Sequence, residues 1–110
     1  MQITQRDHSG ATVFVLEGRV DSDGAVELDT VLQNALSAGQ YRIVLDMAGV
    51  SYINSAGLRT LADVLTQSRA NDGDLRLVAL SPRVQRIFAI IGFDRFFDSY
   101  DSVEAALAGW

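Results

Sequence analysis

The sequence predicts an α/β fold, in which a mixed sheet of four to five strands carries about four helices, packed mainly on one face. The 110 residues, 48% of them hydrophobic, suffice for one domain with a buried core. Two apolar runs, at residues 43–45 and 75–80, lack the alternation of a half-exposed strand, and one helical segment separates them. Such runs are typical of parallel strands that are covered on both faces and joined by a right-handed crossover.

Two strands and a helix are expected in the first third of the chain. Residues 3–8 and 12–20 have the composition of strands, and a turn around Gly10 joins them. A helical repeat of apolar residues follows the acidic cluster at residues 21–23 and ends before Gly39. The acidic side chains are candidate N-caps, and their charges suit the start of a helix dipole.

The central part of the chain joins a strand to a helix through small polar residues. The strand at residues 43–45 is expected to end at Asp46, and a link through residues 48–50 follows it. Asn54 and Ser55 stand directly before leucines spaced by three and four residues, so one of them is the expected N-cap of the second helix.

In the last third of the chain, the sequence predicts two helices and a short strand. Ser81 is the expected cap and Pro82 the first residue of a third helix, which Gly92 ends. A short strand at residues 96–97 and a final helix within residues 99–107 complete the chain. The inward face of the third helix is expected to consist of Val84, Ile87, Phe88 and Ile91.

The hydroxyl of Ser55 has two compatible interpretations. As a helix cap it would accept a backbone N–H and contribute about 1 kcal/mol to stability. As a phosphorylation site it would place an anion where free N–H groups and the helix dipole favour one. Gly57 lies in the first turn, where Ala would be better by roughly 0.5–1 kcal/mol, so we expect another surface to approach closely there. Ala56 is small and leaves the hydroxyl accessible.

The stretch LDMAGVSYINSAGLRTLADVL, at residues 45–65, resembles the signature of STAS domains, above all that of the bacterial anti-sigma-factor antagonists. In that family the motif reads approximately Asp-Ser-Ser/Thr/Ala-Gly-Leu after a strand that ends in Leu-Asp. Residues 18–21, residues 80–88 and the final short helix after Tyr100 also fit. The resemblance implies a STAS-like fold for a domain over residues 1–110.

The resemblance also implies where the site lies. The serine that a partner kinase phosphorylates in this family corresponds to Ser55, and Asn54 occupies the position where the family usually has Asp. Asn keeps the capping geometry but lacks the charge, which would affect kinase or partner selectivity. The expected partner-binding surface consists of Asp21, Asn54, Ser55, Ala56, Gly57 and Leu58.

By resemblance, the expected function is that of an anti-sigma-factor antagonist. Its unphosphorylated form would sequester an anti-sigma factor, a serine kinase of the histidine-kinase-like ATPase type. Phosphorylation of Ser55 would end that binding, and a serine phosphatase would restore it. The alternative is a constitutively docked STAS subunit of a lipid-transport or sensory scaffold complex, which need never be phosphorylated.

Composition argues against several other classes of protein. A net charge of −5 and nine dispersed Arg without Lys do not suit a nucleic-acid-binding face. With no Cys and one His, we expect no metal site and no cofactor. No catalytic motif is recognisable, so we expect no enzymatic activity. No apolar run approaches the roughly 20 residues of a membrane span, and we expect a cytoplasmic protein without membrane insertion.

Overall fold

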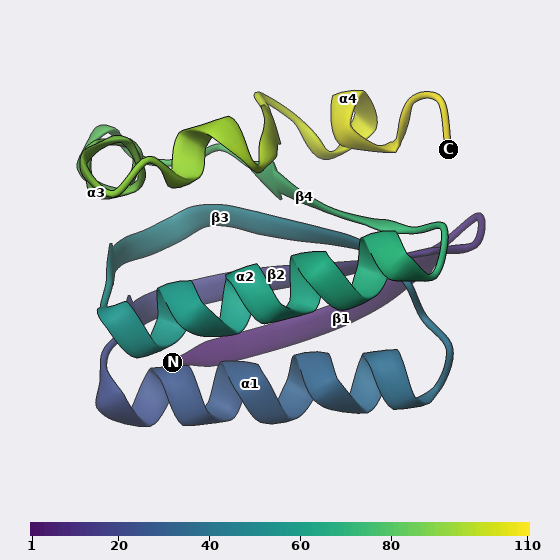
Figure 1. Ribbon diagram of the computed structural model, residues 1–110, viewed down its shortest axis with the longest axis horizontal. Coiled ribbons are helices and arrows are strands. Elements are labelled where there is room, and N and C mark those ends of the chain that lie inside the picture. Colours follow the sequence, from purple (N-terminus) through teal and green to yellow (C-terminus); the bar gives the residue numbers. More distant parts are fainter.

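The computed structural model describes residues 1–110 and contains a five-stranded mixed sheet (Figure 1). The strands lie in the sheet in the order in which they occur in the sequence. The first strand is antiparallel to its neighbour, and the remaining pairs are parallel. The strands are β1 (Gln2–His8), β2 (Ala11–Val20), β3 (Arg42–Ile53), β4 (Asp74–Val78) and β5 (Asp98–Tyr100). The predicted mixed sheet and the parallel central pair are therefore confirmed.

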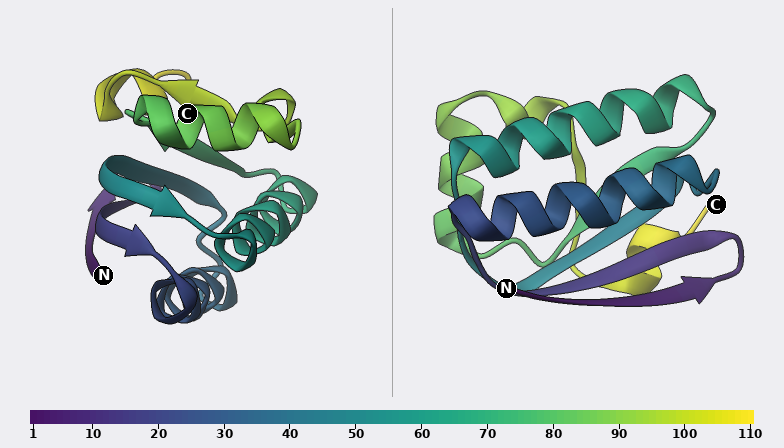
Figure 2. Two further views of the ribbon diagram at one scale, coloured as in Figure 1. Left: turned by 90° about the vertical axis from the view of Figure 1, so that its left-hand side faces the viewer. Right: turned by 90° about the horizontal axis from the view of Figure 1, so that it is seen from below.

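Helices connect the parallel strands and cover the sheet. The long helices α1 and α2 lie side by side along one face, as Figures 1 and 2 show from three directions. A 3-10 turn, η1, at Phe93–Arg95 follows the third helix. The helices are α1 (Ser22–Ser37), α2 (Ser55–Ala70), α3 (Pro82–Ile90) and α4 (Val103–Leu107). The α/β class and the approximate number of helices agree with the sequence prediction.

The core has two parts because alternate residues of β2 and β3 point to opposite faces of the sheet. Phe14 and Leu45 belong to the larger part, which contains 22 buried residues and includes side chains from α1, α2 and α3. Val13 and Val44 point to the other face, where Ala106 of α4 covers them. Both faces of these strands are thus buried, as their unbroken apolar runs predict.

The expectation that the central strand ends at Asp46 was wrong. β3 continues to Ile53, and its pairing with β2 passes through two register shifts. Asp46 lies at the first shift, where its Oδ1 accepts a hydrogen bond from the backbone N–H of Ala48 at 3.1 Å. The polar residue therefore stabilises a bulge within the strand, and a bulge lets a strand continue past an extra residue.

Three details near the C-terminus also differ from the sequence prediction. The short strand is Asp98–Tyr100 rather than residues 96–97, because Phe97 is buried in the core and the pairing to β4 begins only after it. The last helix begins at Val103, after its cap Ser102, rather than within residues 99–102. Ile91 is 45% exposed, because it follows the last turn of α3 and precedes the chain reversal at Gly92, whose φ is 77°.

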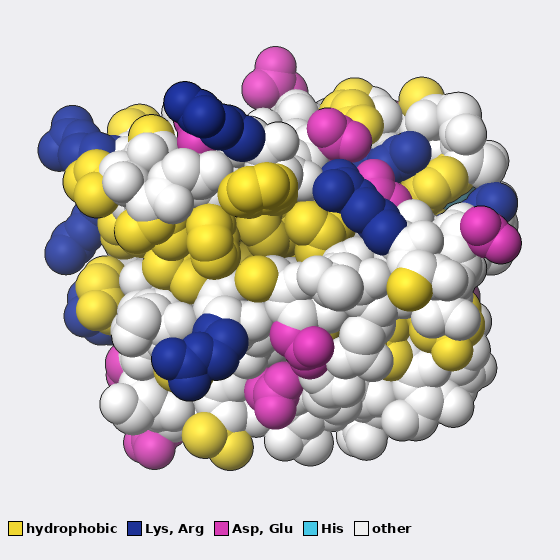
Figure 3. All heavy atoms as spheres, in the orientation of Figure 1, with side chains coloured by type: hydrophobic (Ala, Val, Ile, Leu, Met, Phe, Trp, Pro, Cys, Tyr) yellow, Lys and Arg dark blue, Asp and Glu magenta, His cyan; other side chains and the backbone are white.

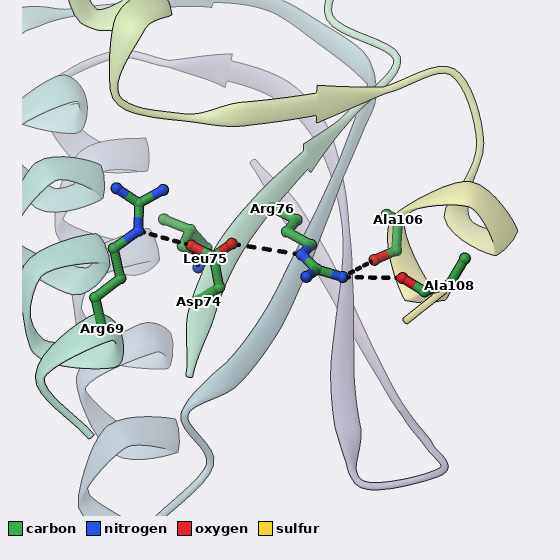
Figure 4. A network of polar contacts seen from close by, with 6 residues as sticks. All are labelled: Arg69, Asp74, Leu75, Arg76, Ala106 and Ala108. Carbon is green, nitrogen blue, oxygen red and sulfur yellow. Dashed lines mark hydrogen bonds and ion pairs between the residues drawn. The ribbon is translucent and has the colours of Figure 1, made fainter. Parts of the chain in front are cut away.

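A buried carboxylate joins three elements at the start of β4 (Figure 4). Asp74 Oδ1 accepts hydrogen bonds from Arg69 Nε of α2 and from the Leu75 backbone N–H, both at 3.0 Å. Its Oδ2 lies 3.4 Å from Arg76 Nε, and Arg76 Nη1 donates to the Ala106 carbonyl of α4 at 2.7 Å. Asp74 is only 9% exposed and pairs with the poorly exposed Arg76. Each of these two charges therefore needs the other to compensate for its loss of water.

Replacing Asp74 by Asn should lower the free energy of unfolding by about 1–3 kcal/mol, because the amide leaves the poorly exposed Arg76 guanidinium without a counter-charge. Urea denaturation followed by circular dichroism measures the change. The matched control is Asp72→Asn in the exposed turn before β4, where φ is 63° and Asn is tolerated. Its effect should stay within about 0.5 kcal/mol, and equal losses for both variants would contradict the role of the network.

Candidate functional site

Two helices begin side by side at one edge of the sheet. β2 and β3 are parallel, and their last residues, Val20 and Ile53, are paired in register. Each strand passes directly into a helix, through Asp21 into α1 and through Asn54 into α2. The backbone N–H of Asn54 donates to the Val20 carbonyl at 2.9 Å. This hydrogen bond holds the two strand-to-helix turns together.

Both turns are closed by side-chain caps. Asp21 Oδ1 accepts a hydrogen bond from the Gly24 N–H at 3.0 Å, and Asn54 Oδ1 accepts one from the Gly57 N–H at 2.8 Å. Of the two candidates for the α2 cap, the structure selects Asn54. The interpretation of Ser55 as the cap was wrong: its side chain is exposed and its hydroxyl makes no hydrogen bond within the chain.

Gly57 permits this close arrangement. A Cβ at this position would lie 2.6 Å from Val20 Cγ1 and 2.8 Å from Ile53 Cγ1, which is too close for real atoms. The expected close approach of another surface is thus confirmed, and that surface is the end of the β2–β3 pair. The first turn of α2 packs directly onto the strands that precede the two helices.

The six residues expected to bind a partner therefore divide into two layers. Asp21, Ser55 and Ala56 are exposed, and Asn54 is half-buried between them and the strands. Gly57 and Leu58 are buried and face the core, with Leu58 only 6% exposed. Of the six, the first four contribute accessible surface at this edge, while Gly57 and Leu58 position the turn from beneath.

The structure adds three residues that the sequence prediction did not include. Tyr52 lies three residues before Ser55, near the end of β3. The guanidinium carbon of Arg19 lies 4.6 Å from the ring centroid, and that of Arg83 lies 5.7 Å from it. We call Arg19, Tyr52 and Arg83 the Tyr52 cluster. Arg19 and Tyr52 are neighbours only because of the register shifts in β3, and Arg83 comes from α3, so no local sequence pattern indicates the cluster.

The functional groups that this edge offers are the exposed hydroxyl of Ser55 and the free backbone N–H groups at the start of α2. Such a position accommodates a phosphate well, because the start of a helix favours an anion. Nowhere in the chain do three or more His, Asp or Glu side chains gather as metal ligands would. None of the helices has the combined length and hydrophobicity that crossing a bilayer requires.

Together these features define a small α/β module that presents an exposed serine at the start of a helix capped by its neighbour. A family model for the STAS domain matches residues 2–106. The chain therefore belongs to the STAS domain family, and the resemblance noted in the sequence is confirmed.

The relatives and solved structures agree with this assignment. The chain is 37% identical over 110 residues to a protein of Bordetella bronchiseptica that is named "Putative anti-sigma factor antagonist BtrV"; the match covers 100% of this chain and 95% of BtrV. A crystal structure of an anti-sigma factor antagonist from Mycobacterium paratuberculosis superposes with a TM-score of 0.86 and 25% identity, covering 96% of this chain and 90% of that one. The Bacillus protein SpoIIAA in its phosphorylated form has the same fold, with a TM-score of 0.74, 18% identity, and coverage of 94% and 96%.

The assignment of the cap leads to a testable difference between adjacent residues. Asn54→Ala should lower the free energy of unfolding by about 1 kcal/mol, because the Gly57 N–H loses its acceptor. Ser55→Ala, the matched neighbour, should change it by less than about 0.5 kcal/mol, because the hydroxyl has no partner in the fold. Chemical denaturation of both variants distinguishes the assignments, and the reverse order of effects would identify Ser55 as the cap.

Proposed function

We propose that this protein is an anti-sigma-factor antagonist that acts as a phosphorylation-controlled binding module rather than as an enzyme. Its unphosphorylated form would sequester, in the cytoplasm, an anti-sigma factor that is a serine kinase of the histidine-kinase-like ATPase type. The observation that carries the proposal is the exposed Ser55 hydroxyl, which the fold does not use, at an edge where two helix starts meet. The names of BtrV and of the Mycobacterium paratuberculosis structure support the proposal.

The proposed docking surface is formed by Asp21, Asn54, Ser55 and Ala56, with Gly57 and Leu58 beneath it. The Asn54–Val20 hydrogen bond and the close packing at Gly57 support this choice, because they keep the turns in one fixed geometry. A partner then finds a preorganised surface, and little conformational entropy is lost on binding.

Phosphorylation of Ser55 would act on the interface and leave the fold intact. The phosphate adds a charge of about −1.5 to −2 at neutral pH. The N–H groups at the start of α2 tolerate it, and the cap is unaffected because Asn54 provides it. A partner surface that fits a neutral serine would have to bury or repel a dianion. A penalty of about 3 kcal/mol would weaken binding roughly 150-fold, and a serine phosphatase would restore it.

The neutral side chain of Asn54 is also compatible with a phosphate on Ser55. Its amide caps α2 without adding a negative charge, whereas an aspartate there would stand beside the phosphate as a like charge. The phosphorylated form of this chain is therefore expected to hold its phosphate with less internal repulsion than a relative with Asp at this position.

Intact mass spectrometry tests the phosphorylation directly. Incubation with ATP, Mg²⁺ and a candidate histidine-kinase-like serine kinase from the same organism should add one phosphate, which peptide mapping should locate on Ser55. Ser55→Ala should stay unmodified, and the control Ser51→Ala, a change at an exposed serine of β3, should still be phosphorylated. A stable complex without any phosphate would favour the alternative, a constitutively docked STAS subunit of a lipid-transport or sensory scaffold complex.

The electrostatic mechanism predicts a difference between two substitutions of similar size. Ser55→Asp should weaken binding to the kinase at least about 10-fold, because it adds a charge at the interface. Ser55→Asn, which adds similar volume without charge, should weaken it much less. Both variants should keep the circular-dichroism spectrum of the unmodified protein, and calorimetry measures the affinities. Equal affinity of the Asp and Asn variants would exclude charge as the cause.

A further inference from the structure

Two arginines share the aromatic ring of Tyr52, three residues before the exposed serine. In the Tyr52 cluster, Arg19 approaches the ring of Tyr52 from the neighbouring strand β2, and Arg83 approaches it from the first turn of α3. Tyr52 is half-buried, whereas both arginines are exposed. The cluster thus lies at the surface, at the same edge of the sheet as Ser55.

A third arginine stacks on aromatic rings elsewhere in the chain and serves as an internal comparison. Arg76 lies 3.9 Å from the Trp110 ring and 5.8 Å from the Tyr100 ring. Its guanidinium is paired with Asp74 and donates to the Ala106 carbonyl, so its charge and donors are used within the fold (Figure 4). That arginine is a structural residue.

The arginines of the Tyr52 cluster have no such partners. Neither Arg19 nor Arg83 takes part in an ion pair or donates a hydrogen bond to the chain. Stacking fixes the plane of a guanidinium while its N–H donors stay free for a carboxylate or phosphate oxygen. Two like charges at one ring also repel each other, and an anion placed beside them removes that repulsion.

Charge is divided along this edge of the molecule. Arg59 in the second turn of α2 is a further exposed arginine, whereas Asp21 and Asp23 stand at the start of α1. Figure 3 shows basic side chains along the left-hand edge, where α3 and the start of α2 lie in Figure 1, with acidic side chains below them. A partner with the complementary division would be bound in one orientation only.

We propose that the Tyr52 cluster is a second contact region of the docking surface and that it binds an acidic patch on the partner kinase. This inference rests on the proposed function and adds the charge of the partner to it. A protein carboxylate is favoured over a polyanion such as nucleic acid, because the net charge of −5 repels an extended polyanion while the cluster attracts a local one. Ion pairs between arginine and carboxylate at the rim of an interface mainly raise the association rate and make it depend on salt.

The double variant Arg19→Gln/Arg83→Gln tests the proposal, with the serine kinase that binds the unmodified protein as the probe. At about 50 mM salt the double variant should bind the kinase roughly 10-fold more weakly than the unmodified protein does, mostly because it associates more slowly. At about 500 mM salt the difference should nearly vanish, because exposed charges are then screened. Stopped-flow association at both salt concentrations gives the rate constants, and circular dichroism checks the fold.

The matched control is Arg6→Gln/Arg42→Gln, which removes the same charge from two exposed arginines at the opposite end of the strands. Its association rate should stay within about twofold of the unmodified protein. Equal effects of the two double variants would overturn the acidic-patch proposal and leave the proposed function standing. If the unmodified protein binds no such kinase, the proposed function fails and the acidic-patch proposal with it.

Discussion

The parallel pairing of β2 with β3 is the constraint on which the rest of the structure depends. Parallel strands end at the same edge of a sheet, so the two chains that leave Val20 and Ile53 must begin their helices side by side. The Asn54–Val20 hydrogen bond and the missing Cβ of Gly57 allow the second helix to start directly on the strand ends. The position of Ser55 is thus fixed by backbone pairing and close packing, and needs no contact of its own side chain.

Separating the cap from the exposed hydroxyl has an energetic consequence for regulation. A serine that capped its own helix would exchange a stabilising hydrogen bond for each phosphorylation event, and stability would change with signalling. Here the side chain of Asn54, and not that of Ser55, accepts the Gly57 N–H, so the proposed phosphorylation would leave the cap in place. Under the proposed function, the free energy of that modification would act on the binding interface and not on the stability of the fold.

Much of the fold could be predicted because local chemistry and tertiary structure agree in most elements. Ser81 caps α3 with Pro82 at its first position, Gly92 takes a left-handed conformation after the helix, and the unbroken apolar runs lie in parallel strands.

The prediction from sequence failed where strand pairing overrides local signals. Asp46 is a polar residue after an apolar run, which is typical of a strand end. It stabilises a bulge instead, because β2 continues beside it. The same register shifts bring Arg19 next to Tyr52, so the Tyr52 cluster could be found only in three dimensions. The exposed Ser55 was predicted from sequence, but the choice between the adjacent caps required side-chain geometry.

The sequential order of the strands also bears on how the chain folds. Every strand pairs with the next one along the chain, so each pairing closes a loop no longer than one helix and its turns. The edge with Ser55 requires only that α1 bring β3 back to β2, and this step uses residues from the first half of the chain. Arg83 arrives later in the sequence, with α3. The backbone pairing that places the serine is thus local in sequence, whereas the arginine pair at Tyr52 is complete only once α3 has packed against β3.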